Sequence, residues 1–302
     1  MNHRLVARAL ASAAALVIVV VIPLSQPSGA TIGNDPVYAL TSANHLLTFD
    51  PATPQAITAD RTLTGLRVGE RLVGMDVRPA NRLLYAVGNR SGLYTIDPAT
   101  GAATFRTIIT GLDANGATIR AKLVGRHFGI DFNPVVDRLR IVSNAEQNFR
   151  VNVDTGMVVD ADPTTPGTQF DRPLAFVAGD PNEGRNPSVV GAAYTNNDAN
   201  PLTDTTLYDI DSAREVLAIQ NPPNDGALRT VGSLQFNTNQ FLGFDVSTGL
   251  LGDTAYASLT SRTTGLSSFY TVDLGTGRAG LVGLIGSGFV VVDIAVAQSV
   301  PT

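Results

Sequence analysis

The sequence predicts an all-β protein, a five-bladed β-propeller whose ring is closed by pairing of its C-terminal strand with its N-terminal blade. Three observations favour this fold. An alternating strand that runs into a capped turn recurs five times, and so does a short apolar strand that ends at or beside an Asp. The first and last copies are each incomplete, and each supplies what the other lacks. Intervals near roughly 50 residues between copies are typical of the longer propeller repeats.

The capped-turn element is clearest at residues 93–101, where alternating apolar residues lead into Asp97, Pro98 and Gly101. The Asp side chain caps such a turn, Pro fixes φ near −65°, and Gly accepts a positive φ, so this element predicts a strand entering a hairpin. The same pattern recurs in four other segments: residues 46–54, 148–156, 207–215 and 269–277.

The apolar element has no strict alternation, which is typical of a strand buried on both faces and predicts the innermost strand of each unit. Its copies are residues 72–77, 127–132, 175–180, 241–246 and 289–294. Another strand is expected between the two elements, at residues 83–87, 139–143, 189–194, 254–259 and 36–40. With a return strand after the turn, each unit becomes one four-stranded blade.

The two chain ends indicate how the blades are arranged. The first unit opens at residue 36 without an innermost strand, and residues 289–296 form an innermost strand without successors. Pairing these two segments closes a ring and removes the exposed sheet edges that an open row of blades would leave. The unit that opens at Ala175 is the weakest copy, because two of its loops are long. A six-bladed propeller and a β-sandwich are the alternatives.

The N-terminal residues 1–30 have the features of a signal peptide: Arg4 and Arg8, then an apolar run, then small residues at 28–30. An uncleaved membrane anchor is the alternative. Residues 31–302 are expected to form a single β-propeller domain, and we expect the protein to be secreted, periplasmic or in the cell envelope. No second apolar stretch of spanning length follows, so we expect no membrane span in the mature chain.

Composition narrows the possible chemistry. The chain has no Cys, which excludes thiol catalysis and thiolate metal sites, and its net charge of −5 without a basic cluster disfavours nucleic-acid binding. Only His45 and His127 remain after the signal segment, and the sequence motifs of zinc proteases, serine hydrolases and nucleotide-binding proteins are absent. No catalytic residue is therefore predicted, although a carboxylate-based hydrolase stays open.

The strongest candidate site is the set of aspartates on the innermost strands, where one carboxylate per blade could face the axis and together hold a hard cation such as calcium. The alternative is structural. Gly74, Gly129 and Gly243 lie two residues before their Asp and share its face, which indicates a close blade-to-blade contact with the carboxylate as acceptor. The predicted metal ligands are Asp76, Asp131, Asp180, Asp245 and Asp293.

Several short motifs resemble a bacterial secreted family labelled domain of unknown function 4394. They are GIDFNP at 129–134, DRLR at 137–140, NFR at 148–150, GAAYTNN at 191–197, LYDID at 207–211 and NPPNDG at 221–226. The resemblance covers nearly the whole chain after the signal segment. It implies a secreted or envelope-associated, propeller-like protein, and it brings no established activity, ligand or catalytic residue.

We therefore expect a non-catalytic, monomeric binding protein for a small molecule, a glycan or a protein. Loops on one face of the ring would carry the binding, with residues 179–186, 196–206 and 221–228 as the longest candidates. One alternative is a cation-dependent hydrolase or lyase with an axial aspartate-bound metal, by analogy with other propellers. Another is a structural component of the envelope.

Overall fold

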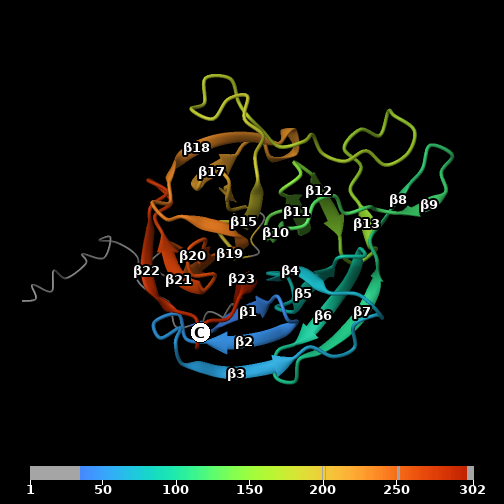
Figure 1. Cartoon of the computed structure of the whole chain (residues 1–302). Coiled ribbons are helices and arrows are strands. Elements are labelled where there is room, and N and C mark those ends of the chain that lie inside the picture. The colour runs from blue at the N-terminus through green and yellow to red at the C-terminus, as the bar shows by residue number, and fades with distance from the viewer. Residues whose placement is uncertain (1–34, 199, 201, 250–251, 298–302) are drawn as a thin grey trace, which may run out of the picture.

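The computed structural model describes residues 35–198, 200, 202–249 and 252–297, and their regular structure is almost entirely β-strand. Five sheets surround one centre, so the fold is the five-bladed β-propeller that the sequence predicts (Figure 1). The six-bladed and sandwich alternatives are wrong. The predicted signal peptide, residues 1–30, lies outside the described residues.

Each blade has four antiparallel strands, and the first strand named for each blade is its innermost one. Blade 1 contains β23 (Val291–Val296), β1 (Val37–Thr41), β2 (His45–Phe49) and β3 (Ile57–Thr62). Blade 2 contains β4 (Leu72–Val77), β5 (Leu84–Gly88), β6 (Gly92–Asp97) and β7 (Ala102–Ile108). Blade 5 contains β19 (Thr238–Gly249), β20 (Gly252–Ser261), β21 (Ser267–Val272) and β22 (Ala279–Leu284).

Blades 3 and 4 carry extra strands on their outer sides. Blade 3 contains β10 (Phe128–Asn133), β11 (Arg138–Ser143), β12 (Asn148–Asn152) and β13 (Met157–Val158), extended by β8 (Thr110–Leu112) and β9 (Thr118–Arg120). Blade 4 contains β15 (Val189–Tyr194), β16 (Leu207–Asp211), β17 (Val216–Gln220) and β18 (Ala227–Ser233), extended by β14 (Ala175–Phe176), and a 3₁₀ turn, η1 (Pro223–Asp225), precedes β18.

The ring is closed by β23, which pairs antiparallel with β1 as the incomplete end units predict. Val37 lies opposite Val296 and Ala39 lies opposite Ile294, and these four side chains are fully or almost fully buried. Beyond the strand, the N–H of Ala297 donates to the carbonyl of Pro36 at 2.8 Å. The last described segment of the chain is therefore the innermost strand of the first blade.

Neighbouring innermost strands approach so closely that two positions require glycine. A Cβ on Gly129 would lie 2.7 Å from the nitrogen of Ala192 in blade 4, and one on Gly243 would lie 2.3 Å from the nitrogen of Ile294 in blade 1. Both distances are far below a van der Waals contact with backbone. The glycines shared by the predicted inner strands thus permit blade-to-blade contact at the centre of the ring.

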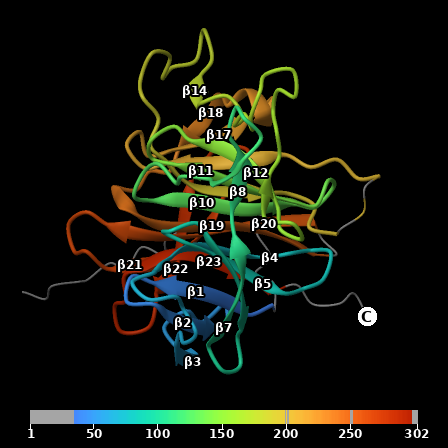
Figure 2. The same ribbon diagram turned by 90° about the vertical axis from the view of Figure 1, so that its right-hand side faces the viewer.

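The predicted innermost strand of blade 4 is wrong. Residues 175–180 contribute only β14, a two-residue strand that pairs parallel with β18 at the outer edge of the blade. The innermost strand is β15, whose six residues are all buried, and Ala193 stands at the position that Asp occupies in β4 and β10. The chain flanking β14 extends beyond the ring in both views (Figures 1 and 2).

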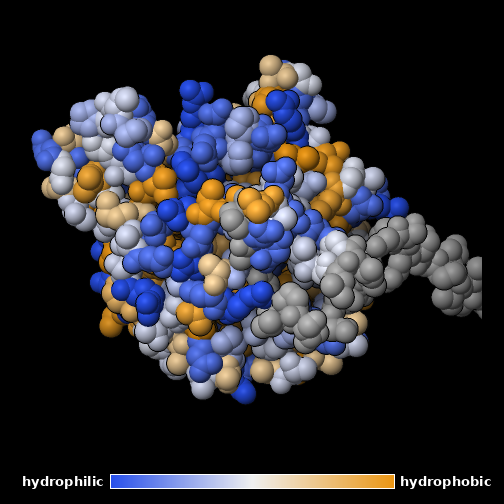
Figure 3. Space-filling model, turned by 180° about the vertical axis from the view of Figure 1, so that it is seen from behind, coloured by the Kyte–Doolittle hydropathy of each residue, from blue (hydrophilic) through white to orange (hydrophobic). Residues whose placement is uncertain are grey.

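The surface seen from behind mixes hydrophilic residues with small, separate hydrophobic patches (Figure 3). Scattered apolar side chains of this kind are ordinary on folded proteins. The described part of the chain contains no helix long and apolar enough to cross a lipid bilayer.

Candidate functional site

Four of the five predicted metal ligands come together at the centre of the ring. Asp76, Asp131, Asp245 and Asp293 lie on the innermost strands β4, β10, β19 and β23, and each is at most 5 % exposed. Oxygens of the first three lie within 4.8 Å of one another. Asp180 does not join them, because it follows β14 at the outside of blade 4 and accepts hydrogen bonds from the backbone N–H and hydroxyl of Thr230.

Each axial carboxylate accepts a backbone N–H from the innermost strand of another blade. The bonds are Phe132 N to Asp76 (2.8 Å), Tyr194 N to Asp131 (3.0 Å), Val296 N to Asp245 (2.6 Å) and Met75 N to Asp293 (2.9 Å). Asp76, Asp245 and Asp293 also accept the N–H of the residue that follows them. Innermost strands have no further strand to pair with, so these carboxylates satisfy N–H groups that would otherwise lack partners.

The aspartates therefore bond across blades, as the structural alternative predicts, although the donors are strand backbone groups rather than loops or Arg. Their environment disfavours charge. Burial raises the pKa of Asp76, Asp131 and Asp293 well above the ordinary value, and repulsion from other axial carboxylates adds to this. Burial likewise raises the pKa of Asp245 to about 7, against the lowering effect of its N–H donors. Such an environment favours the protonated form of the carboxyl groups over the charged form.

A pocket of about 300 Å³ lies at the end of the ring where the innermost strands begin. Its floor is apolar, with Leu72 from β4, Phe128 from β10 and Val292 from β23. Arg71 and Arg126 also line it, each placed one or two residues before an innermost strand. We call this the mouth pocket.

The mouth pocket is electropositive. The side chains of Arg71 and Arg126 are exposed and make no ion pair with any described residue, and no carboxylate lines the pocket. Burial, followed by the charges of these two arginines, lowers the pKa of His127, so its imidazole is neutral at pH 7. The ring of His127 packs edge-on against Phe241, with centroids 4.7 Å apart.

An Asn that follows the second strand of the same blade holds the backbone of each arginine. The N–H of Arg71 donates to Asn89 Oδ1 at 2.9 Å, and the N–H of Arg126 donates to Asn144 Oδ1 at 2.9 Å. The same device thus recurs in blades 2 and 3. The sequence does show an Arg one or two residues before the innermost strand of two consecutive units. This arrangement matches no catalytic or binding motif.

None of the three loops expected to carry binding lines the mouth pocket. Residues 179–186 pack on β18 through Asp180 and Thr230. Residues 196–206 contact blade 5, where the N–H of Asn197 donates to Thr248 at 3.0 Å. Residues 221–228 face blade 3, where Asn224 accepts from Arg140 at 2.8 Å.

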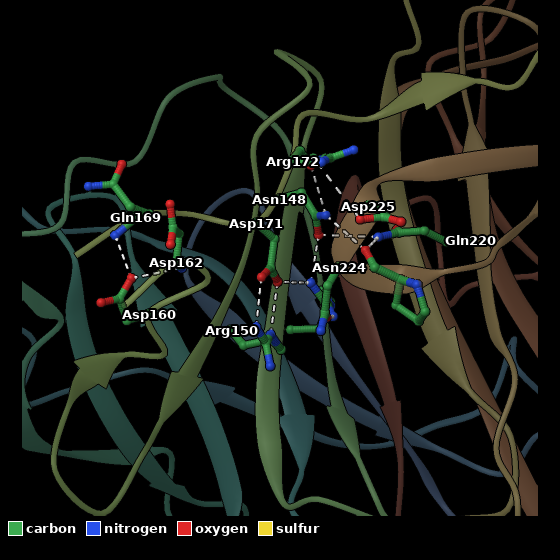
Figure 4. A network of polar contacts seen from close by, with 12 residues as sticks. Asn148, Arg150, Asp160, Asp162, Gln169, Asp171, Arg172, Gln220, Asn224 and Asp225 are labelled. Carbon is green, nitrogen blue, oxygen red and sulfur yellow. Dashed lines mark hydrogen bonds and ion pairs between the residues drawn. The ribbon is translucent and has the colours of Figure 1, made fainter. Parts of the chain in front are cut away.

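The contact between blades 3 and 4 contains a buried ionic network (Figure 4). Arg140 is 1 % exposed, and its Nη1 donates to Asp171 at 2.5 Å and to Asn148 at 2.8 Å. Arg150 donates to the other oxygen of Asp171 at 2.7 Å. Because the Asp171 carboxylate is buried between these two arginines, the network holds the 159–174 segment against blade 3 and offers no open site.

Fold and site together define a five-bladed β-propeller with an electropositive mouth above a buried carboxylate cluster. The chain belongs to the family described as Domain of unknown function (DUF4394), whose model matches residues 45–295. This confirms the resemblance found in its motifs. A comparison with curated proteins finds no significant match.

Solved structures with a similar fold are distant in sequence. A protein of unknown function from Bacteroides thetaiotaomicron is 16 % identical, with 91 % of this chain and 72 % of that chain covered and a TM-score of 0.47. A chain of the nidogen–laminin complex is 12 % identical, with coverage of 88 % and 100 % and a TM-score of 0.47. Hydrazine synthase from Kuenenia stuttgartiensis is 11 % identical, with a TM-score of 0.38. The alignment covers 76 % of this chain, which spans only about half (51 %) of the synthase chain.

Proposed function

We propose that this protein is a non-catalytic binding protein that takes a small organic carboxylate into the mouth pocket. The observation that carries the proposal is the pair of guanidinium groups of Arg71 and Arg126, which lack acidic partners among the described residues and stand over an apolar floor. A carboxylate would accept charge-assisted hydrogen bonds from them while its hydrocarbon part covers Leu72 and Phe128.

Size and charge support this ligand class. A volume of about 300 Å³ is at the lower end of ligand pockets and suits a compact molecule rather than a polymer. The chain as a whole is acidic, with a net charge of −5, so a local positive mouth distinguishes this pocket from the rest of the molecule. Such a field draws small anions towards the pocket.

Titration calorimetry with benzoate and its neutral isostere benzamide tests the proposal. We expect benzoate to bind and benzamide to bind at least about tenfold more weakly, because each charge-assisted hydrogen bond contributes roughly 1.5–3 kcal/mol. The double variant Arg71→Ala, Arg126→Ala should weaken benzoate binding by about tenfold or more without lowering the melting temperature, because both side chains are exposed.

The matched control is Arg278→Ala, which removes an exposed charge before β22, away from the pocket, and should leave benzoate binding unchanged. Equal affinity for benzoate and benzamide, or full affinity in the double variant, would show that the arginines do not form an anion site.

A second candidate function is cation binding by the axial aspartates. It is favoured because carboxylate oxygens of Asp76, Asp131 and Asp245 lie within 4.8 Å of one another. The groups that donate hydrogen bonds to these carboxylates are backbone N–H groups rather than Lys or Arg side chains. We propose calcium, since carboxylate oxygens are its preferred ligands. Because each of these residues is at most 5 % exposed, a cation there would stabilise the ring rather than meet a substrate.

The pH dependence of stability separates a protonated cluster from a metal-bound one. Without a cation, the native state holds more protons than the unfolded chain between the ordinary Asp pKa of 3.8 and the Asp245 pKa of about 7. The free energy of unfolding must then fall as pH rises through that interval, so the melting temperature in excess chelator should drop from pH 5 to pH 8.

Excess calcium should abolish that decline if the cluster binds the ion, because the bound form is ionised and stabilises the native state. Asp245→Asn loses one acceptor and should be less stable overall, but its pH slope in chelator should be flatter. Identical melting curves in calcium and in chelator at pH 8 would contradict calcium binding and would mean that the aspartates serve only to bond one blade to another.

A further inference from the structure

The β8–β9 hairpin projects from the outer side of blade 3 and ends in an open strand edge (Figure 1). In the strand order of this sheet β9 is terminal, and among the described strands it pairs only with β8. Folded proteins usually cover or charge such an edge because its free backbone groups can pair with another chain.

Hydrogen bonding on β8 shows which groups of β9 are free. The N–H of Leu112 donates to Thr168 Oγ1 at 2.8 Å and the N–H of Thr110 donates to the carbonyl of Gly156 at 2.9 Å, so both residues face away from β9. In an antiparallel pair the hydrogen-bonded positions alternate, which assigns the bonded position to Gly111 and Ile119. The N–H and C=O groups of Thr118 and Arg120 therefore point outward from the edge.

A groove beside this edge is partly apolar. It is a cavity of about 510 Å³ to which Leu112, Ile119, Val124 and Phe170 contribute. Ile119 and Val124 are 47 % and 44 % exposed, which is high for large aliphatic side chains placed together. An extended chain laid along β9 would cover them.

The charges beside the edge indicate which kind of chain would bind there. Arg120 and Lys122 are exposed, make no ion pair with any described residue, and line the groove without an acidic neighbour in its wall. Arg120 is the last residue of β9, and its side chain leaves the strand on the face opposite to that of Ile119, whereas Lys122 follows two residues after the strand. A second copy of β9 would bring another cation and no acidic side chain to this edge, whereas an acidic strand would pair with Arg120 and Lys122.

We propose that β9 binds an extended acidic segment of a partner protein by strand addition. Main-chain hydrogen bonds to Thr118 and Arg120 hold the segment, carboxylates of the segment pair with Arg120 and Lys122, and its intervening apolar side chains cover Ile119. The site is independent of the mouth pocket, because it lies on the outermost strand of one blade.

Fluorescence polarisation with a labelled heptapeptide of alternating Glu and Val tests the proposal. The intact protein should bind this peptide, and Arg120→Glu with Lys122→Glu should weaken binding more than tenfold. The double variant Arg229→Glu, Arg278→Glu has the same net charge with the changes on other blades and should bind as the parent does. All four side chains are exposed, so the melting temperatures should be equal.

Two peptide controls separate strand addition from simple charge attraction. A Lys–Val peptide should fail to bind, and so should the Glu–Val peptide N-methylated at its three central residues, because it cannot complete the ladder. Lys122 is the single lysine of the chain, so a carbodiimide cross-link from the peptide carboxylates should map to it by mass spectrometry.

Three results would overturn the proposal. The first is equal binding of the methylated peptide, and the second is equal loss of binding in the Arg229 and Arg278 variant. The third is a dimer in analytical ultracentrifugation that dissociates when Arg120 and Lys122 are reversed, because β9 would then pair with its own copy.

Discussion

A chain that ends at Gly288 is expected not to fold, rather than to fold with a lower melting temperature. This truncation removes β23, whose Val291, Ile294 and Val296 side chains are at most 2 % exposed. Each buried aliphatic side chain contributes roughly 1.5–3 kcal/mol, and the sum is a large part of the about 5–15 kcal/mol that stabilises a domain. The truncation also removes the Asp293 acceptor of Met75 N–H and exposes the whole inner edge of β1.

Circular dichroism and size-exclusion chromatography measure this outcome, and a chain that ends at Ala297 is the control. It keeps β23 and the hydrogen bond to the carbonyl of Pro36, so its melting temperature should equal that of the full chain. Cooperative melting of the Gly288 truncation at the parental temperature would mean that the ring does not depend on β23.

Removing the carboxylate at Asp171 is expected to have the largest effect of any single substitution. Asp171→Ala leaves the Arg140 guanidinium, which is 1 % exposed, without its charged partner. Breaking a buried ion pair from one side typically costs about 3–5 kcal/mol, because the remaining charge stays desolvated. Urea denaturation should show this loss as a lower midpoint.

The adjacent residue provides the control. Arg172 approaches Asp225 at 3.9 Å, but these two side chains are 78 % and 52 % exposed. An exposed pair contributes little, so Arg172→Ala should change stability by no more than about 0.5 kcal/mol. Similar losses for the two substitutions would contradict the effect that we attribute to burial of the Asp171 pair.

The features of the fold that depend on local pattern could be predicted from the sequence. The turn at residues 97–101 follows from Asp, Pro and Gly, and the positive φ of 77° at Gly101 confirms it. Closure by residues 289–296 could be predicted because two incomplete units complete one another. Such inferences need no knowledge of loop paths.

Blade 4 could not be predicted in the same way. Residues 175–180 have the composition of an innermost strand and end in Asp180, but β15 is the segment buried on both faces. Ala193 replaces the marker Asp there, and the long loop after Tyr194 makes residues 207–211 the second strand rather than the third. Composition does not distinguish strand positions when loop lengths change.

The two candidate sites also differ in how far they could be predicted from the sequence. The axial aspartates can be found from sequence because one recurs in four of the five units on strands that must converge. Arg71 and Arg126 could not be singled out from the sequence because an exposed Arg before a strand is common, and only the packing of blade 2 on blade 3 brings these two side chains to one pocket.

The most direct measurement is a crystal structure of the protein with 4-iodobenzoate, in which anomalous scattering locates the iodine. We expect one strong iodine peak over the apolar floor formed by Leu72, Phe128 and Val292, with the carboxylate between Arg71 and Arg126. Iodine peaks only on other surfaces, with the mouth pocket empty at saturating ligand, would contradict carboxylate binding in this pocket.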